Sequence, residues 1–202
     1  MFQAIPGDSI DEPARHPTPD ISLTNTVEQA RAGDSTAFSA LFQQYNSQVC
    51  AYLARLVGND EIGRDLAQET FIRAWKSLPE IRSDQHFKPW LFRIATNAAR
   101  SHLRHTHLIR WLPWQDADAA STNSNLTLEG PEDQAGETEC VQQAMASLSP
   151  QCRTCLLLQL VAGFSQREIA EALGISEKSV SAYVSRGREQ FRTAYRRVKG
   201  AE

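Results

Sequence analysis

Apolar residues recur along most of this chain with the three- and four-residue spacing of an amphipathic helix. The first long stripe lies between a cap at Asp34 or Ser35 and a stop at Gly58. Its members are Phe38, Leu41, Phe42, Tyr45, Val49, Leu53 and Leu56. No pair of alternating segments indicates paired strands, so the pattern predicts an all-α fold.

Two further helices are expected before residue 112. The second follows Asn59 and stops at Pro79, and its inner side carries Ile62, Leu66, Thr70, Ala74 and Leu78. The third has Pro89 near its first position, where the missing N–H costs nothing. It is expected to bury Leu91, Ile94, Ala95 and Ala98. Helical patterning returns at Cys140 and continues to about Val198.

Composition divides the chain between and before these helices. Residues 113–137 hold six acids and no base, and they are rich in Ser, Asn, Gly and Pro, as a flexible linker is. Residues 1–25 hold four prolines, several acids and few large apolar side chains, so disorder is expected there. The predicted organisation is an acidic extension at 1–25, a helical domain at 26–112, an acidic linker at 113–137 and a second helical domain at 138–199.

The second domain carries the signature of a helix-turn-helix. Ser165 and Glu168 are spaced as a capping box, and Gly174 suits the left-handed end of the short helix that follows. Ser176 can then cap a second helix. That helix turns Val180, Val184, Gly187 and Phe191 towards the core. A generic helical hairpin is the alternative, but two capped helices around a glycine turn favour a helix-turn-helix.

The opposite side of that second helix carries short side chains and basic groups. On a helical wheel it carries Lys178, Ser179, Ala182, Ser185 and Arg186. Within residues 178–199 there are seven bases against Glu189 alone. Short side chains permit close approach to a major groove, and cations there meet phosphates or guanine edges. The pattern therefore predicts duplex DNA as a partner.

The third helix of the first domain carries another cationic stripe. Trp90, Arg93, Asn97, Arg100 and Arg104 fall within about 80° of the helical wheel, and no acid lies between Asp84 and Arg110. Such a face suits single-stranded or melted nucleic acid, which is held electrostatically and by stacking. The alternative is a solvated charged face with Trp90 in the core.

Catalytic and metal chemistry find little support in the sequence. The four cysteines, Cys50, Cys140, Cys152 and Cys155, lack a second pair at zinc-site spacing, and Cys155 is expected as a small buried apolar residue. His102, His105 and His107 lack carboxylate or thiol support and are expected at the surface. We therefore predict no catalytic residue, metal or cofactor. With neither a secretory signal nor an apolar run long enough for a membrane span, a cytoplasmic location is expected.

Two stretches of the first domain resemble a known family. Residues 65–75, DLAQETFIRAW, and 90–97, WLFRIATN, are similar to the promoter-opening domain of extracytoplasmic-function (ECF) sigma factors of bacterial RNA polymerase. Residues 147–192 resemble the helix-turn-helix domain of the same proteins. The resemblance covers roughly 26–110 and 138–197, in the family's order.

The resemblance implies partners and sites. Core RNA polymerase would contact Asp65, Gln68 and Glu69 through its clamp helices. The melted minus-10 element would be held by Ser83, Asp84, Trp90, Arg93, Asn97, Arg100 and Arg104. The minus-35 duplex would be read by Lys178, Ser179, Ser181, Ala182, Ser185 and Arg186. An anti-sigma factor is a further expected partner, and the protein would be no enzyme, since the polymerase performs the chemistry.

The chain also departs from the family's pattern. Ser101 stands where relatives usually carry an acid, and residues 181–183 stand where they often carry a basic pair. Two other functions are alternatives. A LuxR-type transcriptional activator would share the C-terminal motif but needs an α/β module in front of it. A thiol enzyme using Cys152 or Cys155 would need a histidine and an oxyanion loop.

Overall fold

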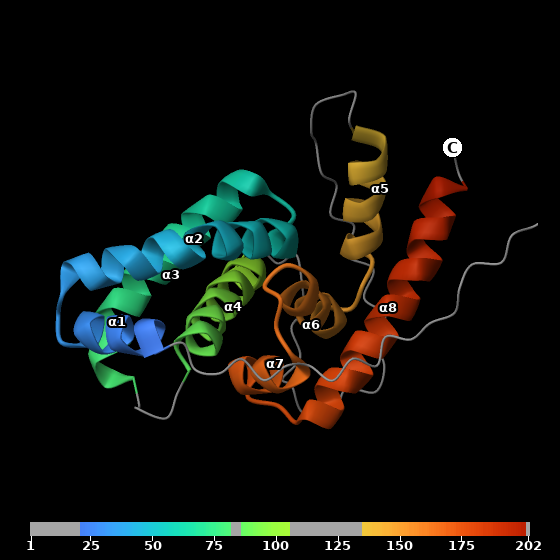
Figure 1. Ribbon diagram of the computed structural model, residues 1–202. Coiled ribbons are helices and arrows are strands. Elements are labelled where there is room, and N and C mark those ends of the chain that lie inside the picture. Colours follow the sequence, from blue (N-terminus) through green and yellow to red (C-terminus); the bar gives the residue numbers. More distant parts are fainter. Residues whose placement is uncertain (1–20, 82–85, 106–134, 201–202) are drawn as a thin grey trace, which may run out of the picture.

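The computed structural model describes residues 21–81, 86–105 and 135–200, and every regular element among them is helical (Figure 1). The predicted all-α class is therefore confirmed. The N-terminal head consists of α1 (Ile21–Arg31), α2 (Ser35–Val57), α3 (Asp60–Ser77), the 3-10 turn η1 (Leu78–Glu80) and α4 (Phe87–His105). The C-terminal head consists of α5 (Ala135–Ala146), α6 (Pro150–Leu160), α7 (Gln166–Leu173) and α8 (Glu177–Lys199).

Local capping sets the hairpin of α2 and α3. The Asp34 carboxylate accepts hydrogen bonds from the N–H groups of Thr36 at 2.8 Å and Ala37 at 3.2 Å. Gly58 ends α2 with a φ of 78°, and the Asn59 side chain caps α3. The helices cross closely at Gly63, where a Cβ atom would lie 2.5 Å from the Cα of Ala54. Only a glycine permits this separation.

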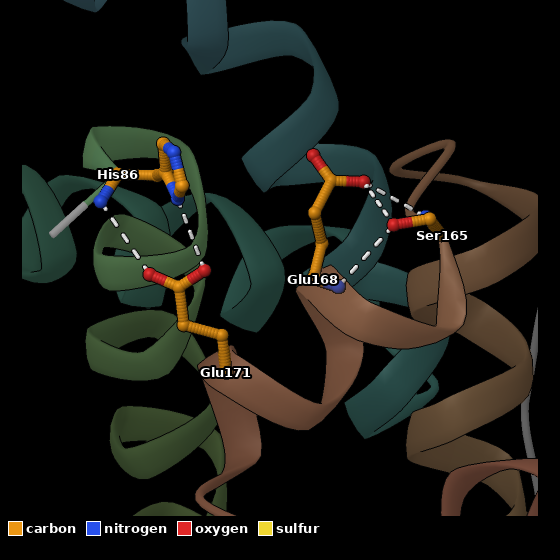
Figure 2. A network of polar contacts seen from close by, with 4 residues as sticks. All are labelled: His86, Ser165, Glu168 and Glu171. Atoms are coloured by element: carbon orange, nitrogen blue, oxygen red, sulfur yellow. Dashed lines mark hydrogen bonds and ion pairs between the residues drawn. The ribbon is translucent and has the colours of Figure 1, made fainter. Parts of the chain in front are cut away.

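The helix-turn-helix forms as its caps predict. In the capping box the Ser165 N–H donates to the Glu168 carboxylate at 2.8 Å, and the Glu168 N–H donates back to the Ser165 hydroxyl at 3.3 Å (Figure 2). Gly174 ends α7 with a φ of 67°, and Ser176 caps α8. The turn therefore holds α8 at a fixed angle to α7.

A buried arginine joins α5 to α6. The guanidinium of Arg153 is enclosed and donates to the carbonyls of Ala146 and Leu148, close to the end of α5. A cation there is favourable because the carbonyl end of a helix is negative. Burial lowers the pKa of Arg153 to about 10, so the group stays charged at neutral pH. This contact fixes where α5 meets the rest of the head.

The two heads lie against each other in the structure (Figure 1). Helix α4 packs on α2 and α3, and on its other side it contacts α7. Phe92 of α4 meets Phe164, just before α7, with ring centroids 5.0 Å apart. Buried residues of both heads consequently form one continuous core, although the sequence indicated two small domains with separate cores.

Two predicted boundaries differ from the structure. Helix α1 begins at Ile21, so residues 21–25 are helical where disorder was expected. The reason is a short apolar stripe, Leu23, Val27 and Ala30, that packs on the core of the N-terminal head. Helix α5 begins at Ala135, inside the stretch assigned to the linker, which gives the buried residues Cys140 and Ala144 a full turn before them.

Candidate nucleic-acid interface

The face of α8 that was predicted to read DNA is open to solvent. Val180, Val184 and Gly187 are buried against the head and so turn the other side of the helix outwards. Five of the six predicted residues are exposed: Lys178, Ser181, Ala182, Ser185 and Arg186. With one methyl, two hydroxyls and two cations, this face fits the groove-reading surface of a helix-turn-helix.

Ser179 has a different role from the other five. It is half-buried, its N–H donates to the Ser176 hydroxyl at 3.1 Å, and the two hydroxyls lie 2.8 Å apart. The side chain is thus turned back to the start of α8. The structure therefore places Ser179 in the helix cap and not with the exposed groups of the reading face, contrary to its position on the helical wheel.

Close packing seats α8 on α6. A Cβ atom at Gly187 would lie 2.7 Å from Cδ1 of Leu156 and 3.2 Å from the Cβ of Cys152. Beyond this crossing the basic residues have local partners. Arg188 donates to Gln159 at 3.1 Å, and Arg192 pairs with Glu189 at 2.9 Å. The positive charge of α8 is therefore carried by an ordered helix surface.

Four of the five residues predicted on the cationic face of α4 lie on a solvent-accessible side of the helix. Asn97 and Arg104 are exposed, and Arg93 and Arg100 are half-buried on the same side of the helix. Burial and the neighbouring charge of Arg104 lower the pKa of Arg100 from its ordinary value. No acid occurs in α4. The predicted residues Ser83 and Asp84 lie outside the described residues.

Trp90 lies in the core. Its side chain is only 7% exposed and packs on Phe87, with ring centroids 5.7 Å apart. The ring therefore offers no open face on which a base could stack in this structure. The interpretation of Trp90 as a core residue is therefore right. This side of α4 is covered by other residues in the first turn and is open to solvent in the later turns.

The polar side of α3 carries the residues predicted to contact polymerase. Asp65 and Gln68 are exposed, and Glu69 pairs with Arg73 one turn further along. Beside Gln68 lies an open apolar hollow of about 380 Å³. It is lined by Ser35, Phe38, Phe42, Gln68, Phe71, Ile72 and Trp75.

This hollow was missed by the sequence reasoning. Phe38 and Phe42 were assigned to the core stripe of α2, yet Phe42 is 39% exposed, and on α3 Ile72 is 49% and Trp75 37% exposed. A signal was present, since Ile72 and Trp75 fall outside the stripe of Leu66, Thr70 and Ala74. Large apolar residues gathered on a surface mark a contact site.

Three of the four cysteines behave as apolar core residues. Cys140, Cys152 and Cys155 are buried, which confirms the expectation for Cys155. Burial raises the pKa of the Cys155 thiol to about 12 and also raises that of Cys152. Both thiols are thus protonated at neutral pH and poor nucleophiles.

No described helix is both long enough and apolar enough to cross a membrane.

Comparisons with known proteins agree with this geometry. The family model of sigma-70 region 2 matches residues 41–108, and that of sigma-70 region 4 matches residues 138–191. The ECF RNA polymerase sigma factor SigW of Bacillus subtilis is 30% identical over 187 residues, covering 88% of this chain and 98% of the relative. The sigma factor NccH of Alcaligenes xylosoxydans is 34% identical over 169 residues, covering 82% of this chain and 90% of NccH.

Solved structures give the same result for the fold. CnrH, solved in complex with the cytosolic domain of CnrY, matches with a TM-score of 0.64 at 25% identity and covers 84% of this chain and 94% of CnrH. RpoE of Bartonella quintana, solved with the anti-sigma factor NepR, matches in fold with a TM-score of 0.59 at 20% identity. That match covers 78% of this chain and 95% of RpoE.

Proposed function

This chain belongs to the ECF sigma factors of bacterial RNA polymerase, and from that membership we propose how its two heads divide the work of initiation. As a sigma factor it binds core polymerase, recognises promoter DNA and starts transcription of a particular set of genes. The family is not an enzyme family. The LuxR-type alternative has no support, because the N-terminal head matches sigma region 2.

We assign polymerase binding to the exposed side of α3 and the hollow beside it. Asp65, Gln68 and Glu69 supply polar contacts, while Phe42, Ile72 and Trp75 offer apolar area that a partner helix can cover. An apolar centre with a polar rim is the usual composition of a protein interface. The clamp helices of the polymerase's largest subunit are the proposed occupant.

We assign the minus-10 element to α4. Arg93, Asn97, Arg100 and Arg104 form a stripe without an acid, which can hold the phosphates of a melted strand. Trp90 supports this face from the core and does not stack on a base. Ser83 and Asp84 remain proposed contacts of the preceding loop.

We assign the minus-35 element to α8. Lys178, Ser181, Ala182, Ser185 and Arg186 reach the groove, and Ser179 fixes the helix start that presents them. The observation that carries the whole proposal is this pair of cationic helix faces, exposed on α8 and partly exposed on α4, one in each head matched by a sigma region.

We further propose that an anti-sigma factor regulates this chain, by analogy with RpoE of Bartonella quintana in its complex with NepR. Its place of action is the cytoplasm, where polymerase and promoter are found. Neither a metal nor a cofactor is needed for the steps assigned here.

The experiment that tests the proposal is binding to core polymerase. The double variant Gln68→Ala/Ile72→Ala removes a polar contact and an apolar contact, and each such truncation at an interface centre costs about 1–2 kcal/mol. We expect affinity for core polymerase to fall at least tenfold, as measured by fluorescence anisotropy. Because both residues are on the surface, the folded state should lose less than about 0.5 kcal/mol per position.

The matched control is Gln48→Ala/Val141→Ala, a glutamine and an aliphatic residue that are also exposed but lie on α2 and α5. This control should bind core polymerase like the unchanged chain. Binding of the Gln68→Ala/Ile72→Ala variant at full strength would reject the assignment of this face.

A further inference from the structure

The hollow between α2 and α3 is lined by aromatic rings and is open to solvent. Phe38 of α2 packs on Trp75 of α3 with ring centroids 4.8 Å apart, and Phe42 meets Phe71 at the same separation. Five large apolar side chains are exposed in the described part of the chain, and three of them line this hollow: Phe42, Ile72 and Trp75. Covering these side chains removes apolar surface from water, so a segment that fills the hollow is favoured.

The first residues of the chain carry apolar groups that match this surface. Phe2 and Ile5 are three residues apart, which is the spacing of neighbours on one face of a helical turn. Pro6 and Gly7 follow them and are typical of a turn. Apolar anchors one turn apart are the means by which a short segment binds in an apolar groove. Residues 2–5 therefore suit the hollow in character and spacing.

The place where the N-terminal extension joins the fold brings it within reach of the hollow. Helix α1 packs on α2 and contacts η1, the turn that follows α3 (Figure 1). This helix begins at Ile21 and rises about 16 Å, and Ser35 of the hollow lies four residues beyond its end. Ile21 is therefore at most about 30 Å from Ser35. The 15 residues between Ile5 and Ile21 span up to about 50 Å, so Ile5 can reach the hollow.

Charge complementarity favours the extension as the occupant. Residues 6–20 hold four acids against one base. Three exposed cations lie next to the hollow: Arg31 at the end of α1, and Arg73 and Lys76 in the last two turns of α3. Opposite charges on two surfaces favour their contact and fix its register. Another apolar stretch outside the described residues, 108–114, contains a base and no acid, so it lacks this complementarity.

We propose that residues 2–5 dock in the hollow of their own chain, with the acids that follow them facing the cations of α1 and α3, and that core polymerase must displace them. This inference rests on the proposed function of the hollow as a polymerase-binding face. A segment on a short tether has an effective concentration in the millimolar range. An intrinsic dissociation constant of about 0.1 mM would then leave about one molecule in ten open, which lowers the apparent affinity for polymerase about tenfold.

The docking is tested in the free full chain with a photo-crosslinker in place of Phe2. The amino acid p-benzoylphenylalanine keeps an aromatic group at this position and, on irradiation, bonds to neighbouring C–H groups, which mass spectrometry then identifies. We expect the main products to join position 2 to residues 35–42 or 68–75 of the same chain. The matched control carries the same amino acid in place of His16 and should link to these two ranges at least fivefold less.

Other products of irradiation would contradict the proposal. A link between two molecules would show that the hollow takes the extension of a second copy. A main product elsewhere on the same chain would show that the extension binds another face. Either result overturns the docking, as does a yield at position 2 that does not exceed that of the control.

The competition with polymerase is tested with the variant Phe2→Glu/Ile5→Glu, which puts two charges on the apolar anchors. We expect its affinity for core polymerase to exceed that of the unchanged chain about tenfold, as measured by fluorescence anisotropy, because the hollow is then open in every molecule. The control His16→Glu/Thr18→Glu adds the same charge away from the anchors and should bind like the unchanged chain. Equal affinities of Phe2→Glu/Ile5→Glu and the unchanged chain would overturn the competition.

The two measurements separate the docking from the proposed function. The crosslink is formed without polymerase and decides by itself whether residues 2–5 occupy the hollow. If neither the unchanged chain nor the variants bind core polymerase, the proposed function is wrong, and the competition falls with it.

Discussion

Lys178 and Arg186 lie on the same exposed face of α8 but two turns apart. In a docked helix-turn-helix the first turns of the second helix meet base edges, whereas later turns approach the backbone. We therefore predict that Lys178→Ala loses about 1–3 kcal/mol on the preferred minus-35 sequence and relaxes base choice there. Arg186→Ala should weaken binding to all sequences by a similar factor. It should also reduce the slope of log affinity against log salt concentration by about one, the contribution of one phosphate contact.

The measurement is binding of holoenzyme to a randomised minus-35 library at several salt concentrations. Thr193→Ala is the control, since it is exposed on α8 beyond the proposed reading face. If both variants kept the base preferences of the unchanged protein and differed only in affinity, the proposed division between Lys178 and Arg186 would be wrong.

Individual site residues were predictable where periodicity alone decides exposure. The wheel placed Lys178, Ala182 and Arg186 on the outer face correctly, because Val180 and Val184 fix the inner one. The wheel misplaced Ser179, because it cannot show that the Ser179 hydroxyl bonds to the helix cap. It left Trp90 undecided, because it cannot show that neighbouring residues cover the ring. Such contacts are not determined by the spacing of residues along the chain.

The helices themselves were largely predictable, because their stop and start signals are local. Asp34, Gly58, Asn59 and the capping box of α7 all act as the sequence indicated. The close crossing of α2 and α3 at Gly63 was not predicted, because a glycine has no side chain and so adds nothing to the periodic pattern of apolar positions in a helix. The contact of Gly63 with Ala54 shows why this residue matters.

Two buried helical glycines make a matched test of helix crossing. Ala raises helix propensity by about 1 kcal/mol over Gly at both positions. At Gly63 the new Cβ meets the backbone of Ala54 at 2.5 Å, which no side-chain rotation relieves, whereas at Gly187 its nearest atom is the movable end of Leu156 at 2.7 Å. We predict that Gly63→Ala lowers the free energy of unfolding by about 2 kcal/mol net, and Gly187→Ala by less than about 1 kcal/mol.

Urea denaturation followed by circular dichroism measures both values. A larger loss for Gly187→Ala than for Gly63→Ala would contradict the packing described for the two crossings. The unchanged chain and Ser39→Ala, an exposed substitution on α2, serve as references.

At the scale of the whole molecule the sequence indicated the class and the two heads but not their contact. Lys88 and Ala162 are 74 residues apart, and His86 and Glu171 are 85 apart. Each of these residues has an ordinary interpretation within its own segment of the chain, so only the assembled fold reveals that they meet. The continuous core follows from the same long-range contacts.

The central claim is that this one chain lets core polymerase find and open promoters, with α8 reading duplex DNA and α4 holding the melted strand. The most direct measurement is transcription in vitro by core polymerase plus this protein on a promoter library, sequenced from the transcript ends. The account predicts new start sites preceded by two shared sequence elements, one at the minus-10 and one at the minus-35 position. Arg100→Ala/Arg104→Ala should lose those starts on closed templates while largely keeping them on templates with a pre-melted bubble, and Arg55→Ala should behave like the unchanged chain. No new start sites with the unchanged protein, or equal loss by the Arg100→Ala/Arg104→Ala variant on both templates, would contradict the account.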